Sequence, residues 1–140
     1  MMAAIQEEKA KRRAEREWVD VAARIALDAE RLRANCRSLT GFVREAWHVV
    51  EPSADYVHGW HIDAICQHLE AVTAGEITRL LINVPPGTMK SLLCGVFWPA
   101  WEWGPMGRPQ MRYLGASYSE HYAKRDNRRM RDLVASEWYQ

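Results

Sequence analysis

The pattern of hydrophobic and polar positions predicts a long charged helix near the N-terminus. Over residues 5–34 apolar side chains recur at helical spacing, and charged residues fill most of the other positions. The resulting narrow stripe consists of Trp18, Val21, Ala22, Ile25, Ala29 and Leu32. Such a stripe fits packing on the domain or on a partner helix, and a helical arm without a specific role fits equally. Residues 35–59 have weak periodicity and indicate an irregular connection with a short helix at 40–48.

A clearer amphipathic helix follows over residues 60–73, and a short apolar run comes directly after it. Its apolar face consists of Ile62, Ile65, Cys66, Leu69 and Val72, and Gly75 stands just past its end. The run at 79–84 is bounded by Gly75 and by two prolines, which is typical of a buried strand in a parallel sheet.

The remaining pattern predicts one βαβ unit. A helix starts at about Lys90, Pro99 kinks or ends it, and a turn-rich crossover leads to a second apolar run at 111–116. A last helix is predicted over 118–134. Two apolar strands joined by a crossover helix run parallel, so the predicted fold class is α/β, as an incomplete P-loop NTPase.

The length and the charge distribution indicate two parts of the chain, and they do not identify a binding partner. With 140 residues one globular domain is expected at 41–140, preceded by a charged helical segment at 1–40. The net charge is +1, with the basic excess at the two ends of the chain. The three cysteines are widely spaced, which favours reduced thiols over a disulfide framework or zinc site. Neither a membrane span nor a secretory signal is recognisable.

The candidate chemistry lies between the first predicted strand and the following helix. Phosphate binding needs backbone N–H groups at a helix start, an ammonium group for the β- and γ-phosphates, and a hydroxyl for Mg²⁺. The loop Val84–Ser91 offers Gly87, Lys90 and Ser91 for these roles, although the pattern G-x-x-x-x-G-K-[ST] has glycine where Val84 and Met89 stand. An ordinary strand–turn–helix with an exposed lysine explains the local pattern equally well.

Four segments in order give the loop a family context. They are Gly59–Val72, Gly75–Ser91, Phe97–Gly104, and Gly115–Ser119 with Arg125–Arg128. Together they resemble the start of the ATPase domain of phage terminase large subunits. The resemblance covers roughly 80 of the 140 residues clearly. It implies an ATP-driven motor that packages double-stranded DNA into a capsid in the host cytoplasm, with the terminase small subunit and the capsid portal as partners.

The resemblance also implies roles for individual residues. ATP phosphates would be held by Pro86, Gly87, Thr88, Met89, Lys90 and Ser91, with Mg²⁺ reached by Ser91 through the nucleotide. Trp60 and His61 fall near the adenine pocket of the family, and a hydrophobic staple at the helix start explains Trp60 equally well. Many members of the family carry a basic residue inside the loop where Gly87 stands here, so that contribution is absent.

The residues for hydrolysis and DNA cleavage are not recognisable. No apolar run ends in an acidic pair, as a Walker B strand would, and no acidic cluster suggests a two-metal nuclease. We therefore expect a truncated terminase fragment with no catalytic residue of its own, oligomeric at most in the full-length protein. The alternatives are an inactive remnant or interaction module of a phage or prophage, and, less well supported, a small kinase.

The helix predicted over 118–134 suggests a nucleic-acid contact. Lys124, Arg128 and Arg131 share one face, which fits binding to DNA phosphates. A solvated helix face, partly neutralised by Asp126 and Asp132, is the alternative.

Overall fold

The computed structural model describes the backbone of residues 2–140, and the side chains of residues 6–9 and 11–140. It forms two compact units, Met1–Ala34 and Asn35–Gln140. The predicted boundary between helical segment and domain lies at residue 40, a few residues further along.

The first unit is one helix, α1 (Met2–Asn35). Its sequence contains no glycine or proline and is rich in alanine, the strongest helix former. Ion pairs one turn apart add support, with Arg12 Nε 2.9 Å from Glu8 and Arg13 Nε 3.0 Å from Glu17. The helix predicted over residues 5–34 is confirmed.

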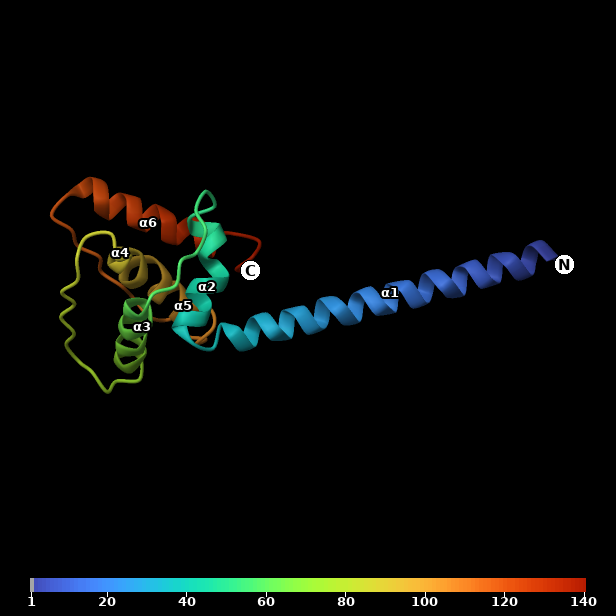
Figure 1. Ribbon diagram of the computed structural model, residues 1–140, viewed down its shortest axis with the longest axis horizontal. Helices are drawn as coiled ribbons and strands as arrows, with labels where there is room; N and C mark the ends of the chain where they lie inside the picture. The colour runs from blue at the N-terminus through green and yellow to red at the C-terminus, as the bar shows by residue number, and fades with distance from the viewer. Residues whose placement is uncertain (1) are drawn as a thin grey trace. The chain divides into compact units, whose positions relative to one another are not determined.

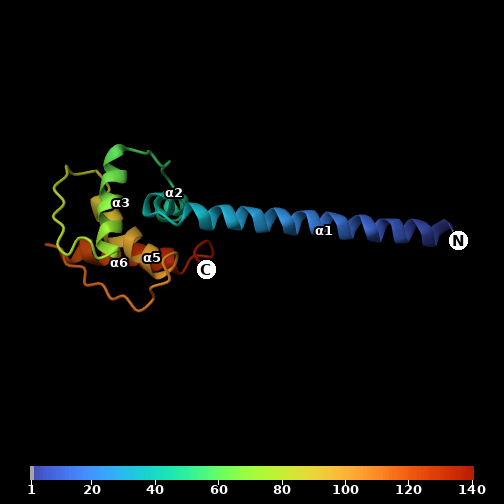
Figure 2. The ribbon, with the colours of Figure 1, turned by 90° about the horizontal axis from the view of Figure 1, so that it is seen from below.

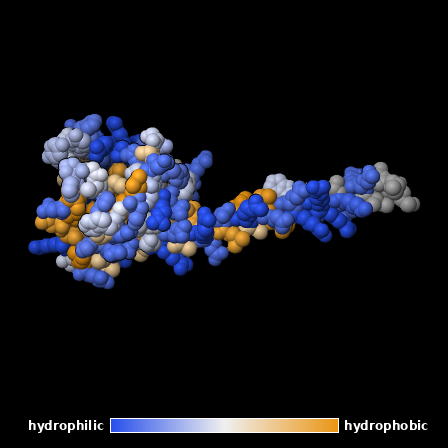
Figure 3. Space-filling view, viewed as in Figure 1, coloured by the Kyte–Doolittle hydropathy of each residue, from blue (hydrophilic) through white to orange (hydrophobic). Residues whose placement is uncertain are grey.

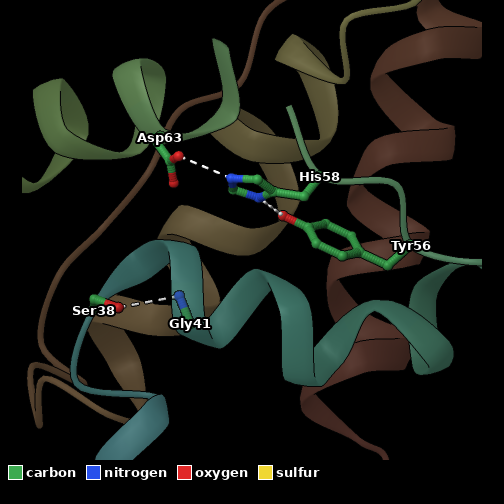
Figure 4. Close-up of polar contacts among 5 residues, drawn as sticks. All are labelled: Ser38, Gly41, Tyr56, His58 and Asp63. Carbon is green, nitrogen blue, oxygen red and sulfur yellow. Dashed lines mark hydrogen bonds and ion pairs between the residues drawn. The ribbon is translucent and has the colours of Figure 1, made fainter. Parts of the chain in front are cut away.

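The second unit is also helical (Figure 1). It contains α2 (Leu39–Val50), α3 (Trp60–Thr73), the consecutive α4 (Lys90–Leu92), π-helix η1 (Leu93–Phe97) and α5 (Trp98–Trp103), and then α6 (Glu120–Val134). The predicted helices at 40–48, at 60–73 and from Lys90 onwards are confirmed, and the one at 118–134 begins two residues later. Ser38 starts α2 by accepting a hydrogen bond from the Gly41 N–H at 3.1 Å (Figure 4).

The core of this unit lies where α2, α3, η1 and α6 meet. Phe42 and Phe97 are almost fully buried, with their rings edge to face at 6.5 Å. The tryptophans around α5 then tie other segments to this core. The Trp98 indole donates to Thr73 Oγ1 at 2.8 Å, and that of Trp101 donates to the Cys36 carbonyl at 2.9 Å.

The α/β prediction is wrong for this structure. Helices make up 63% of the chain, and no strand occurs among the described residues. The segments predicted as strands, 79–84 and 111–116, are extended without a sheet, and they run as separate loops in Figure 2. Leu81 is 86% exposed and Leu114 is 98% exposed, so the expected buried βαβ unit with parallel strands is absent there.

The physical reason is that an apolar run specifies an extended backbone but not a hydrogen-bonding neighbour. A two-stranded sheet is marginal alone, and a parallel pair is slightly weaker per residue than an antiparallel one. Here both runs line one cavity instead of pairing.

Among the described residues, no helix is both long and apolar enough to cross a bilayer.

Candidate phosphate-binding site

The loop that precedes α4 has an unusual backbone. Gly87 has φ +84° and Met89 has φ +62°, so both lie in the left-handed region that favours glycine. Met89 is the single non-glycine residue with positive φ in the described chain. The Thr88 hydroxyl donates to the Pro85 carbonyl at 2.8 Å, which closes the turn. Alternation of left-handed and ordinary residues turns successive N–H groups toward a concavity, a shape that binds anions.

The helix start adds further free donors to the loop. Leu93 is the first residue whose amide bonds back into the turn, to the Met89 carbonyl at 2.9 Å. The N–H groups of Lys90, Ser91 and Leu92 precede it and therefore have no helical partner. Helical structure continues from Lys90 to Trp103, so the partial positive charge at its start belongs to a helix of several turns.

The loop and α6 together line an open cavity of about 310 Å³. Its lining is loop residues Val84–Leu92 and one residue from elsewhere, Arg125 of α6. The Arg125 guanidinium lies 4.9 Å from the Tyr122 ring centroid and 2.8 Å from Asp126 Oδ1. These contacts hold it in place, so Lys90 and Arg125 both face one cavity, and Asp126 partly neutralises the charge of Arg125.

A larger cavity of about 740 Å³ shares Lys90 and Ser91 with the first one. It is lined by the two extended segments, by η1 and by α6, including the acidic residues Glu120 and Asp126. Tyr113 contributes a buried hydroxyl that has no hydrogen-bond partner among the described residues. Burial raises the pKa of Cys94 on this cavity, and the nearby Lys90 charge acts against that rise. Lys90 and Ser91 therefore stand where the two cavities meet.

The predicted phosphate residues come together, whereas the predicted adenine residues do not join them. Pro86, Gly87, Thr88, Met89, Lys90 and Ser91 all line the smaller cavity. Trp60 opens α3 with its side chain 82% exposed, so it is not a buried staple. The His61 ring packs against Gly59, and neither residue lines these two cavities.

The predicted DNA-contact residues lie on α6, and two of them have acidic partners. Lys124 pairs with Glu120, and Arg131 Nη2 lies 2.8 Å from Asp132 Oδ1. Arg128 has no ion pair within the described side chains. Lys124 and Arg128 line a shallow cavity of about 270 Å³ on α6, and Arg131 does not.

The described residues of the loop offer an exposed hydroxyl near the helix start and no cluster of metal ligands. No group of three or more histidine, cysteine or acidic residues could hold an ion among the described residues. Ser91 is exposed at the helix start, where its hydroxyl could reach a cation already bound to phosphates.

Arg125 is the residue of this site that the sequence reasoning did not select. It lies next to the predicted basic face, and only its spacing from Tyr122, one helical turn away, signals a fixed position.

A second arrangement that the sequence reasoning missed is a series of hydrogen-bonded polar side chains. His58 Nε2 lies 2.9 Å from Asp63 Oδ2, and its Nδ1 lies 3.1 Å from the Tyr56 hydroxyl (Figure 4). Burial raises the pKa of Tyr56. These two hydrogen bonds connect residues 56–58 to the first turn of α3.

Comparisons with known proteins give no family for the chain. No protein-family model, curated protein or solved structure matches it.

Proposed function

We propose that this chain binds the triphosphate of Mg²⁺·ATP at residues 86–91, as the ATP-binding portion of a motor of the terminase large-subunit type. The observation that carries the proposal is the left-handed conformation of Met89 directly before Lys90. The P-loop pattern has glycine at this position, and glycine adopts that conformation without strain. A non-glycine residue held there indicates that the surrounding loop imposes the shape, which is typical of functional sites.

Phosphate binding does not require the predicted sheet. The N–H groups and the helix start supply neutral donors, and Lys90 and Arg125 supply charge in the same cavity. Ser91 would complete the coordination of the Mg²⁺ that ATP brings. Trp60 and His61 line neither cavity, so the proposal covers the phosphates of the nucleotide and not its base.

The motor assignment adds double-stranded DNA as a partner. Lys124, Arg128 and Arg131 would contact its phosphates, which makes binding strongly salt-dependent. A terminase small subunit, a portal and the host cytoplasm follow from the same assignment. Binding rather than hydrolysis is proposed for the described residues.

The test is a calorimetric titration of the full chain with Mg²⁺·ATP. Lys90→Ala and Arg125→Gln should each weaken binding about tenfold or more, because a hydrogen bond to a charged group contributes about 1.5–3 kcal/mol. Arg112→Gln is the matched control, since Arg112 is exposed and lines none of the three cavities.

Competition identifies the part of the ligand that is held. Inorganic tripolyphosphate should displace ATP, and adenosine should not. Equal affinity of the wild type and Lys90→Ala, or absence of binding by the wild type, would refute the phosphate site.

A second candidate function is an interaction module, and the exposed apolar side chains of α1 favour it. Trp18 is 74% exposed and Ile25 is 64% exposed. This candidate function does not depend on ATP binding.

A further inference from the structure

The apolar positions of α1 follow a coiled-coil repeat. Trp18, Ile25 and Leu32 are seven residues apart, and Ala22 and Ala29 lie between them at alternating steps of four and three. In heptad terms the large residues occupy d and the alanines occupy a. Upstream, Glu15 falls at a and Lys11 at d, so the apolar seam begins at Trp18.

The first part of the seam is open to solvent in the single chain, whereas Ala29 and Leu32 are half-buried. The exposed fraction is 74% for Trp18, 64% for Ile25 and 48% for Val21, which occupies the neighbouring g position. Figure 3 shows the hydrophobic residues of α1 gathered along its middle, with hydrophilic stretches around them. Large apolar side chains grouped on an exposed helix are typical of a surface that another protein covers.

The charges beside the seam indicate which protein covers it. In a parallel pair of helices, a g residue faces the e residue five positions later on the partner helix. Here g and e residues at that separation match: Asp28 meets Arg33, Val21 meets Ala26, and Ala14 meets Val19. Asp28 and Arg33 form no ion pair among the described side chains. One charged pair, Asp28 with Arg33, is therefore complementary to a second copy in parallel register, and the other two pairs are apolar.

We propose that α1 is a self-association element that binds a second copy of this chain as a parallel two-stranded coiled coil over residues 18–33. The association is weak. Two Trp18 side chains cover on the order of 300 Å² together, against about 1,200 Å² for the smallest stable interfaces. A dimer formed this way brings two copies of residues 35–140 together only at high local concentration.

Sedimentation equilibrium of the full chain, from about 5 to about 500 µM, tests the proposal. The wild type should approach twice the mass of one chain at the upper end. Ile25→Asp should raise the dimer dissociation constant at least about tenfold, because a charge enters the seam. Leu27→Asp is the matched control, with Leu27 67% exposed and at position f on the opposite face, and it should dimerise like the wild type.

Charge exchange tests the parallel register. Asp28→Arg and Arg33→Asp should each weaken dimerisation, because like charges then face each other. The double variant should restore wild-type association. A monomeric wild type at the highest concentration overturns the proposal, as does equal weakening by Ile25→Asp and Leu27→Asp. Failure of the double variant to recover overturns the parallel pairing.

Discussion

The left-handed backbone at Met89 makes a prediction about alanine and glycine. At an ordinary helical position alanine is more stable than glycine, because glycine gains more freedom on unfolding. At Met89 the order should invert. Both substitutions remove the side chain beyond Cβ, so the comparison isolates the backbone and not the loss of packing. Gln67, which is exposed in the middle of α3, provides the ordinary position.

The magnitude follows from two opposing effects. A left-handed L-residue costs about 1–2 kcal/mol, and alanine retains that cost whereas glycine does not. The extra freedom of glycine in the unfolded chain offsets about 0.5–1 kcal/mol of the gain. Met89→Gly should therefore exceed Met89→Ala in unfolding free energy by about 0.5–1 kcal/mol. At Gln67 alanine should exceed glycine by about 1 kcal/mol.

Urea unfolding followed by tryptophan fluorescence measures the four variants. All tryptophans except Trp18 lie within Asn35–Gln140, so the signal reports on the unit that contains Met89. The two Gly–Ala differences should have opposite signs and differ by about 1.5–2 kcal/mol. If alanine is more stable than glycine at Met89 as well, the loop does not hold the left-handed shape, and the phosphate proposal loses its main support.

Two further predictions concern the core. Arg108→Ala should lower the unfolding free energy by about 2–3 kcal/mol in urea titrations, because Glu102 is 1% exposed with Arg108 Nη1 3.5 Å from its Oε1. Adding Glu102→Gln should recover part of this loss, and no recovery would contradict a charge effect. Burial raises the pKa of the Cys66 thiol from 9.0 to about 12. Its contribution to stability should thus be complete below pH 9 and fall between pH 9 and 12, by up to about 1.4 kcal/mol per pH unit. Cys66→Ala should flatten the measured stability over that range, and an unchanged slope would contradict the assignment.

The helices were predictable because their signals are local. The apolar face of residues 60–73 repeats every helical turn, and α3 begins and ends at those residues. The charged stripe of α1 gives the same local information. Neither helix requires knowledge of a long-range contact to be predicted.

The prediction of a sheet was wrong because the burial of a strand is not a local property. The run around Leu81 has the composition of a buried strand, but burial depends on partners that the run cannot specify. The site was predicted in part. Pro86 to Ser91 are neighbours in sequence, so their grouping is local, whereas Arg125 reaches the loop through the packing of α6. The shape of Met89 also depends on the folded loop.

The π-helix between Lys90 and Trp103 has a consequence for how the chain tolerates change in length. A π-turn accommodates one residue more than an α-turn, and one residue corresponds to about 100° of rotation. Gly95 lies within η1 and is exposed, so its deletion would remove no buried side chain and would let η1 become α-helical. The face that carries Lys90 and Ser91 would then keep its direction relative to the face that anchors Phe97 and Trp101, because the π-turn holds the extra residue without rotating the segments on either side. A deletion within a purely α-helical segment would instead turn the charged end of the helix by about 100°, so η1 lets this helix lose one residue and still present Lys90 to its loop.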